Sequence, residues 1–394
     1  MFVGDSLTNI RLLRGLSRKQ LAEELDLTEQ SIWQYENGYI SPSLQVINKM
    51  RTYFNVQPKY FYSNLNLSNE INEQQIAYRS TVRNSRQKTK SETVYLEFLN
   101  YVTNYLSSII TFPPNQIKAI KDYAVNYKSK NAGYLEMDEI IEHIASYARN
   151  SIGLSDQHNE DLLFLIEKSG AFIFEKSFGD TVDACSTWSS SGIPYIILGN
   201  IKKTAVRRNF DLAHELGHLL LHYKMDITDL NNKEYSTIEK EANTFARHFL
   251  LPKEEFLSDL KTVSKISNPD AYSVLKKKWK VSIAAMAYHA YSLNQMTYQQ
   301  YRYFNASLNR KNYKLMEPLD DEIVIMKPGK IRSSFEAIFE KDVRSVEDVL
   351  GYLKFELKSL ASLLDVEQEF FEKYMIKAEH PKVYDFVVQE NGIL

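Results

Sequence analysis

Residues 210–222 read FDLAHELGHLLLH, and they contain the pattern His-Glu-x-x-His inside an apolar run with helical periodicity. Residues four positions apart lie on one face of an α-helix, so His214 and His218 can bind one zinc ion together. Glu215 is then held beside the metal, where its carboxylate can take a proton from zinc-bound water. The alternative interpretation is two histidines packed on a helix without metal.

A catalytic zinc site needs a third protein ligand and leaves a fourth position for water. The next predicted helix, residues 236–250, contains two candidate carboxylates, Glu239 and Glu241. On a helical wheel Glu239 falls at the edge of the apolar stripe, whereas Glu241 points more toward solvent. We therefore expect Glu239 to be the third ligand, with Asn243 one turn further on orienting a ligand histidine.

Two alternatives to Glu239 stay open at this point. Ser236-x-x-Glu239 is also a capping-box pattern, which would make this glutamate a helix-start residue. The other alternative is Glu241 as the true ligand. The nearby His222 and His248 are expected to be surface or packing residues.

The N-terminal segment, residues 5–60, is predicted to form short helices, because apolar residues recur there at helical spacing. Ser17 and Thr28 are natural N-caps for two of these helices, and a turn around residues 26–28 joins them. Through the strings LSRKQLA and SIWQYENG this segment resembles helix-turn-helix domains, and the resemblance implies that the second of the two helices enters the major groove of DNA.

Candidate DNA contacts follow from that placement. Gln30 and Gln34 can make bidentate contacts to adenine, and Glu29 can either accept a hydrogen bond from cytosine or hold a neighbouring basic side chain. Other polar side chains are candidates for phosphate contacts. The predicted DNA-binding residues are Arg18, Gln20, Thr28, Glu29, Gln30, Ser31, Gln34 and Asn37.

Residues 1–60 carry seven Lys/Arg and six Asp/Glu, so this segment is nearly neutral. Phosphate attraction should be modest for a monomer, and we expect a homodimer on a two-part operator in double-stranded DNA. The alternative is a helical interaction module without DNA binding. Trp33 and Tyr35 are expected to lie in the core.

The composition of the 394 residues is that of a globular protein, with 44% hydrophobic and 25% charged residues. A net charge of −2 excludes a broadly basic nucleic-acid coat. The single cysteine, Cys185, excludes an intrachain disulfide and is expected to be small and buried. No apolar run is long enough to span a membrane, and the N-terminal residues MFVGDSLTNIRLLRG lack the apolar core and cleavage site of a signal peptide, so we expect a cytoplasmic protein.

The predicted fold is mainly α with a small β-sheet, an α+β class. Strands are expected over Ala171–Phe178 and Ile193–Gly199, and the second of them could offer an edge to an extended peptide or be a core strand. We find no internal repeat. The predicted organisation is a helix-turn-helix domain at 1–62, a linker at 63–90, a metallopeptidase domain at 91–300 and a region of unknown role at 301–394.

The last region shows no chemical motif. Its run Ile323–Met326 is compatible with a strand, and Val346–Leu364 reads as one amphipathic helix.

Two strings, AHELGHLLLH and EKEANTFARHFLLP, resemble the two signatures of ImmA/IrrE-type metallopeptidases. The resemblance covers about residues 150–300 and implies a compact zinc-peptidase fold of helices with a small sheet. It implies His214 and His218 as ligands, Glu215 as general base, and the glutamate of the EKEAN string as third ligand. It also implies regulated cleavage of one or a few protein partners, often repressors, and mobile elements such as phages as a setting.

The strings LSRKQLA and SIWQYENG, within residues 5–62, resemble the XRE/Cro-type helix-turn-helix family. Together the two resemblances imply a DNA-binding transcriptional regulator fused to a peptidase that holds one Zn²⁺ per chain. The alternative is a non-proteolytic repressor whose zinc domain senses a ligand or a partner protein.

Overall fold

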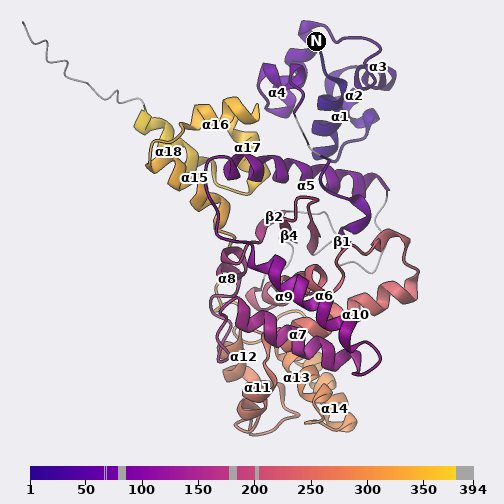
Figure 1. The fold of residues 1–394 in the computed structure, drawn as a ribbon, viewed down its shortest axis with the longest axis vertical. Helices are drawn as coiled ribbons and strands as arrows, with labels where there is room; N and C mark the ends of the chain where they lie inside the picture. The colour runs from indigo at the N-terminus through magenta and orange to yellow at the C-terminus, as the bar shows by residue number, and fades with distance from the viewer. Residues whose placement is uncertain (66, 68, 79–85, 177–183, 200–203, 379–394) are drawn as a thin grey trace, which may run out of the picture. The chain divides into compact units, whose positions relative to one another are not determined.

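The structure is a computed structural model, and it describes residues 1–394 except 66, 68, 79–85, 177–183, 200–203 and 379–394 (Figure 1). The chain forms two compact units. The terminal unit comprises Met1–Ile10, Arg18–Leu65 and the chain from Arg332 onward. The central unit comprises Arg11–Ser17 and Asn66–Ile331. Residues Asn66–Ile331 of the central unit therefore separate the N-terminal and C-terminal parts of the terminal unit along the chain.

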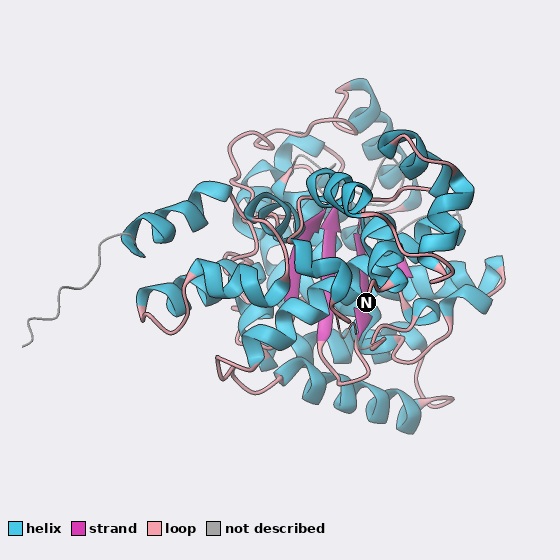
Figure 2. Cartoon of the chain, turned by 90° about the horizontal axis from the view of Figure 1, so that it is seen from above, coloured by secondary structure: helices cyan, strands magenta, loops and turns pink. Residues whose placement is uncertain are grey.

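Helices make up most of the described chain, and its strands form one small sheet, so the α+β class is confirmed (Figure 2). Short helical turns lie at η1 Pro58–Tyr62, η2 Glu73–Gln75, η4 Ile227–Asp229 and η5 Pro269–Tyr272. The α-helices up to the sheet are α1 Gly4–Leu13, α2 Arg18–Leu25, α3 Glu29–Glu36, α4 Leu44–Phe54, α5 Arg86–Ser107, α6 Gln116–Asn131, α7 Met137–Ser151 and α8 Leu162–Lys168. Those after it are α9 Ala205–Leu221, α10 Asn232–Leu250, α11 Lys253–Leu260, α12 Ser273–Trp279, α13 Ile283–Ser292, α14 Tyr298–Arg310, α15 Lys330–Glu340, α16 Val346–Leu353, α17 Leu357–Leu364 and α18 Gln368–Ala378.

The sheet has four strands in the order β1-β3-β4-β2. Its strands are β1 Ala77–Tyr78, β2 Phe172–Lys176, β3 Ala184–Trp188 and β4 Pro194–Gly199. β4 pairs in parallel with β2 and antiparallel with β3, and β1 pairs antiparallel with β3. All residues of β3 and β4 are buried, because helices of the central unit, α9 among them, pack against these strands.

α9 and α10 pack closely against each other in the main core of the central unit. Gly217 makes this possible: a Cβ atom at that position would lie 3.0 Å from Cδ1 of Phe245. Phe245 is fully buried, as are Ala213 and Leu220 on the facing helix. The close approach brings the polar edges of both helices within hydrogen-bonding distance of each other, which is what positions the site described below.

Several predictions about the strands need correction. β3 was not expected from the sequence, and β4 is an interior strand because β2 and β3 occupy both of its sides. The alternative that β4 presents an edge to a peptide is therefore wrong. Ile323–Met326 is not a strand: no described strand lies beside it, and Val324 is 75% exposed. Phe178 and residues 79–85 of the predicted linker lie outside the described residues.

Two predictions about the terminal unit also fail. The predicted helix Val346–Leu364 is two helices, because Lys354 adopts a left-handed conformation with φ 64° that ends α16. Trp33 is 36% exposed rather than in the core, and its ring stacks on Tyr39 at 5.1 Å. Tyr35, by contrast, is buried as expected.

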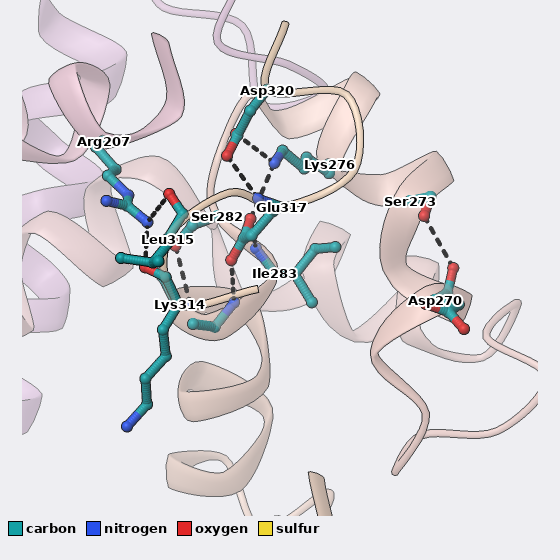
Figure 3. A network of polar contacts seen from close by, with 12 residues as sticks. Arg207, Asp270, Ser273, Lys276, Ser282, Ile283, Lys314, Leu315, Glu317 and Asp320 are labelled. Carbon is teal, nitrogen blue, oxygen red and sulfur yellow. Dashed lines mark hydrogen bonds and ion pairs between the residues drawn. The ribbon is translucent and has the colours of Figure 1, made fainter. Parts of the chain in front are cut away.

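A buried ionic network ties residues 314–320 to the helices of the central unit (Figure 3). The Lys276 ammonium is fully buried and lies 2.9 Å from Glu317 Oε2 and 2.6 Å from Asp320 Oδ1. Glu317 also accepts a hydrogen bond from the backbone N–H of Ile283 at the start of α13. Buried charges need such partners, so this network holds the chain beyond α14 against α12 and α13.

Within the described part of the chain, none of the helices combines the length and apolar character required to cross a bilayer.

Candidate metal centre

The two histidines of the α9 motif point at each other and at a carboxylate from α10. His214 Nε2 and His218 Nε2 are 3.0 Å apart. Glu239 places Oε1 3.2 Å from His218 Nε2 and Oε2 3.5 Å from His214 Nε2. The three ligand atoms all lie within 4.8 Å of one another, and the histidines are buried.

This arrangement fits a zinc ion. Zinc–nitrogen bonds of about 2.0–2.1 Å at tetrahedral angles put two ligand nitrogens roughly 3.3 Å apart, close to the distance between the two imidazoles. Two imidazoles and one carboxylate are also the ligand set of many catalytic zinc sites. The three side chains would therefore hold the ion and leave a coordination position for water.

Glu239 lies in the interior of α10 and does not begin the helix. α10 starts at Asn232, and a capping box between Asn231 and Glu234 closes its first turn. The interpretation of Ser236-x-x-Glu239 as a helix start is therefore wrong. Burial raises the pKa of Glu239, but hydrogen bonds from His214 and His218 outweigh it and bring the pKa below its ordinary value.

Asn243, one turn after Glu239, contacts the other side of His214. Its Oδ1 lies 3.1 Å from His214 Nδ1. An imidazole that donates from Nδ1 to an amide oxygen keeps its lone pair on Nε2. The contact therefore fixes the tautomer in which His214 Nε2 can bind a metal.

The predicted reading helix α3 is arranged as the motif requires. Thr28 caps it by accepting a hydrogen bond from the backbone N–H of Ser31 at 3.1 Å. Glu29 and Gln30 are exposed in the first turn, and with Arg18 and Trp33 they line an open polar hollow.

The remaining predicted DNA contacts lie in different surroundings. Arg18 Nε is 2.5 Å from Glu36 Oε2, so its guanidinium is held by α3. Gln34 is half-buried, whereas Gln20 is exposed. Asn37 is exposed and donates its amide to the carbonyl of Trp33 at 2.8 Å. The structure thus brings Arg18, Glu29 and Gln30 together, and uses Asn37 to close the end of α3.

Residues 166–291 match the peptidase family M78 model described as the IrrE N-terminal-like domain, and residues 7–61 match a helix-turn-helix model. The chain therefore joins a helix-turn-helix segment to an IrrE-like segment. A curated relative, an uncharacterized HTH-type transcriptional regulator of Rickettsia prowazekii (strain Madrid E), is 46% identical over 37 residues. That match spans 9% of this chain and 28% of the regulator's length. These findings support a DNA-binding regulator fused to a peptidase-like domain.

A chain of hydrogen-bonding groups lies behind His218 in the IrrE-like segment. His218 Nδ1 is 3.0 Å from His222 Nδ1, and His222 Nε2 is 3.2 Å from Glu241 Oε2. Lys128 of α6 donates to the same Glu241 oxygen at 3.1 Å. A carboxylate can only accept, so His222 donates from Nε2 and His218 donates from Nδ1. His218 is then left with its lone pair on Nε2, facing His214 and Glu239.

The protonation states of His222 and Glu241 follow from their surroundings. Burial lowers the pKa of His222 to about 4, against the opposing effect of Glu241, so the ring is neutral at pH 7. Burial raises the pKa of Glu241, but the hydrogen bond from His222 and the nearby Lys128 outweigh it and lower the pKa to about 2. His222 was expected to be a surface or packing residue. It is buried, and it also contacts His218 directly. Glu241 contacts His222, whereas Glu239 is the carboxylate beside the Nε2 atoms of His214 and His218.

Glu215 is fully buried between α9 and β3. Ser186 of β3 donates its hydroxyl to Glu215 Oε2 at 2.7 Å. Sequence reasoning missed Ser186 because it missed β3; the only sequence signal was the short run ACSTW ahead of the loop to β4. His218 also lines a small pocket together with Gln75, Ala77 and Trp188. β1 and β3 therefore contribute to the surroundings of the centre.

Cys185, adjacent to Ser186, is 1% exposed, as expected, and burial raises the pKa of its thiol well above the ordinary value.

Proposed function

We propose that the chain is a transcriptional regulator that binds an operator through α3 and cleaves a specific protein partner at a zinc centre in its IrrE-like segment. The convergence of His214, His218 and Glu239 from two helices carries the proposal. A repressor is the kind of partner that the resemblance favours. Zinc, one ion per chain, is the proposed metal.

Three protein groups would hold the ion. His214 and His218 offer Nε2 lone pairs because their Nδ1–H groups donate hydrogen bonds to Asn243 and His222. Glu239 supplies the negative charge, and its lowered pKa means that no proton has to leave it first. When bound, zinc lowers the pKa of a water molecule toward neutrality and polarises the scissile carbonyl.

Glu215 is the proposed general base. It follows a ligand histidine directly in sequence, as the motif requires, and Ser186 fixes one of its carboxylate oxygens. The carboxylate would take the proton from the attacking water and deliver it to the leaving amine. Ser186 would keep Glu215 in place during both transfers.

DNA binding is proposed to use the first turn of α3, where Glu29 and Gln30 are exposed beside Arg18. A homodimer on a two-part operator would supply a second set of contacts, which a nearly neutral helix-turn-helix needs. Sedimentation of the full-length chain with and without DNA tests this assembly. A 1:1 complex on the operator would contradict it.

The first experiment measures zinc content per chain in wild type, Glu239→Gln and Glu241→Gln. We expect about one zinc in wild type and in Glu241→Gln, and none in Glu239→Gln. Full occupancy of Glu239→Gln would overturn the ligand assignment. Wild type without zinc after metal addition would favour a regulator that does not cleave.

The second experiment separates metal binding from cleavage. Glu215→Gln should keep its zinc, because Glu215 is not a ligand, yet lose cleavage of the partner protein. The assay is gel electrophoresis of candidate partners incubated with zinc-loaded full-length chain. Equal cleavage by wild type and Glu215→Gln would contradict the role of Glu215.

A further inference from the structure

The C-terminal region repeats part of the N-terminal sequence. Residues 21–27 read LAEELDL, and residues 360–366 read LASLLDV. The repeated leucine, alanine, leucine and aspartate occupy the same positions in both strings. The expectation of a chain without internal repeats is therefore wrong.

The two strings also share their backbone geometry. Asp26 has φ 55° and Asp365 has φ 50°, so each helix ends in the same left-handed turn. The N–H after that aspartate donates back to the alanine carbonyl in both cases, over 2.8 Å to Ala22 and 3.1 Å to Ala361. α2 and α17 are each eight residues long, and α3 and α18 each begin three residues after the aspartate.

The correspondence extends on both sides of these turns. The left-handed Gly15 before α2, with φ 69°, corresponds to the left-handed Lys354 before α17, with φ 64°. The same core positions are buried in both segments. In the first they are Leu21, Ala22, Leu25, Ile32 and Tyr35, and in the second Leu360, Ala361, Leu364, Phe371 and Tyr374. Helices α16, α17 and α18 therefore repeat the order, the left-handed turns and the buried positions of α1, α2 and α3, as a second helix-turn-helix would.

The helix that would read DNA has different chemistry in the second copy. Thr28, Glu29 and Gln30 of the first copy correspond to Glu367, Gln368 and Glu369, all exposed, so this turn carries two carboxylates in the second copy and one in the first. Carboxylates at these positions would face the phosphates that line the groove, and like charges repel. The exposed start of α18 is thus unfavourable for DNA.

A second difference is that α18 packs against a neighbouring helix, α15. Phe370 stands at the position of Ser31 and is buried, with its ring 6.4 Å from Phe339 of α15. The Arg332 guanidinium covers the same ring at 4.8 Å. Tyr374 donates its hydroxyl to Glu336 at 3.3 Å. α15 therefore occupies part of the surface that the first copy leaves open for base edges.

The second copy also docks on the first within the terminal unit. Val56 and Phe355 form an antiparallel bridge. Gln57 N–H donates to the carbonyl of Lys354 at 2.9 Å, and Glu356 N–H donates to the carbonyl of Asn55 at 3.1 Å. Each segment gives one hydrogen bond and receives one, so the contact is reciprocal.

The contact is also apolar and closed to solvent. Phe54, Val56, Tyr60 and Phe355 are all fully buried, and the rings of Tyr60 and Phe355 are 5.9 Å apart. Ser359 of α17 donates its hydroxyl to the carbonyl of Phe54 at 2.9 Å. Full burial of these apolar side chains stabilises the docked arrangement.

We propose that residues 346–378 are a second helix-turn-helix that does not read bases and serves as the built-in partner of the first, docked on its α4–η1 side. The part of this inference that concerns DNA rests on the proposed reading by α3. The part that concerns docking does not.

Docking is tested by a disulfide in the full-length chain. Val56 and Phe355 are a non-hydrogen-bonded antiparallel pair, whose Cα atoms lie roughly 4.5 Å apart in such ladders, within the range that a disulfide spans. After mild oxidation, V56C/F355C should retain one reactive thiol under denaturing conditions, that of Cys185. The matched control places the second cysteine on the exposed Ser362 (V56C/S362C) and should retain three. Three thiols in both variants would overturn the docking.

Function is tested with duplexes selected by the wild-type chain from a random-sequence library. The α3 variant E29A/Q30A should bind them at least tenfold more weakly. The matching α18 variant Q368A/E369A should bind within twofold of wild type and select the same sequence. The oxidised V56C/F355C chain should bind as tightly as its reduced form.

Three results would count against parts of this account. A changed sequence preference in Q368A/E369A would make α18 a DNA reader and overturn the proposal. Loss of binding on oxidation of V56C/F355C would overturn permanent docking. Unchanged binding by E29A/Q30A would overturn DNA reading by α3, while the thiol count would still decide the docking.

Discussion

The candidate metal centre and the proposed reading helix α3 hold their polar side chains in opposite ways. His214 and His218 are buried, and both of their ring nitrogens have a partner supplied by another side chain. Glu29 and Gln30 lie on the surface at the open end of α3. The first region has its geometry set by packing, whereas the second leaves its side chains free to adapt to a ligand. Substitutions should therefore affect stability and metal binding in the first region, and only DNA affinity in the second.

The largest expected effect concerns the packing beneath the centre. Phe245→Ala removes the buried ring that rests on Gly217, and we expect the free energy of unfolding to fall by about 3–5 kcal/mol. Zinc affinity should fall with it, because α9 and α10 are no longer held at their present separation. Urea unfolding measures the first effect. Gln30→Ala is the surface control and should change stability by no more than about 0.5 kcal/mol. An equal loss of stability in both variants would contradict the difference between the two regions.

A smaller effect is expected from the groups behind His218. His222→Phe removes the acceptor for His218 Nδ1, and partners of this kind are worth roughly 10–100-fold in metal affinity. Competition with a chromophoric zinc chelator measures the change. His143→Phe is the matched control, since His143 of α7 contacts Tyr123 and not a proposed ligand. If His222→Phe bound zinc as tightly as wild type, the hydrogen bonds from His218 through His222 to Glu241 would have no part in holding the metal.

The surface region should show its effect only with DNA present. Gln30→Ala should cost about 1–3 kcal/mol of binding to a selected duplex if it makes a bidentate base contact. The dependence of affinity on salt should stay the same, because glutamine carries no charge. Fluorescence anisotropy at several salt concentrations tests both statements. A steeper or shallower salt dependence would point to a change in phosphate contacts instead.

The smallest effect near neutral pH is a pH dependence of stability that buried histidines produce and exposed ones do not. His289 is fully buried, and burial lowers its pKa to about 3. The unfolded chain takes up a proton near pH 6.5, so stability is lost as pH falls from about 6.5 toward 3, by at most about 1.4 kcal/mol per pH unit. His289→Gln keeps a donor for the carbonyl of Leu251 and should flatten this slope. An unchanged slope between pH 6.5 and 4 would show that His289 does not cause it.

The sequence predicts the geometry of α9 and α10 well, because that geometry is local. Spacing of four residues places His214 and His218 together on any regular helix, and the apolar stripe of α10 places Glu239 at its edge. Glu241 shows the limit of this reasoning. Its contacts with His222 and Lys128 depend on how three helices pack, and a helical wheel contains no such information.

Features that depend on distant parts of the chain were harder to predict. β3 is five residues long and buried along its whole length, so it lacks the alternating pattern of an exposed strand. Because β3 was not predicted, the role of Ser186 was not predicted either, and β4 was considered a possible edge strand. The second helix-turn-helix was hidden for another reason. Lys354 stands where Gly15 marks the first copy, so no glycine signals the break between α16 and α17.

The docking of α17 on Phe54 joins two parts of the chain that the ribosome synthesises at different times. The hydrogen bond between Ser359 and Phe54 joins residues 305 positions apart. At about 5–20 residues per second, a ribosome needs roughly 15–60 s to cover that distance. For that time the apolar surface that includes Phe54 and Val56 has been synthesised but is not yet covered by α17. The nascent chain therefore exposes this apolar surface to solvent until α17 has been synthesised.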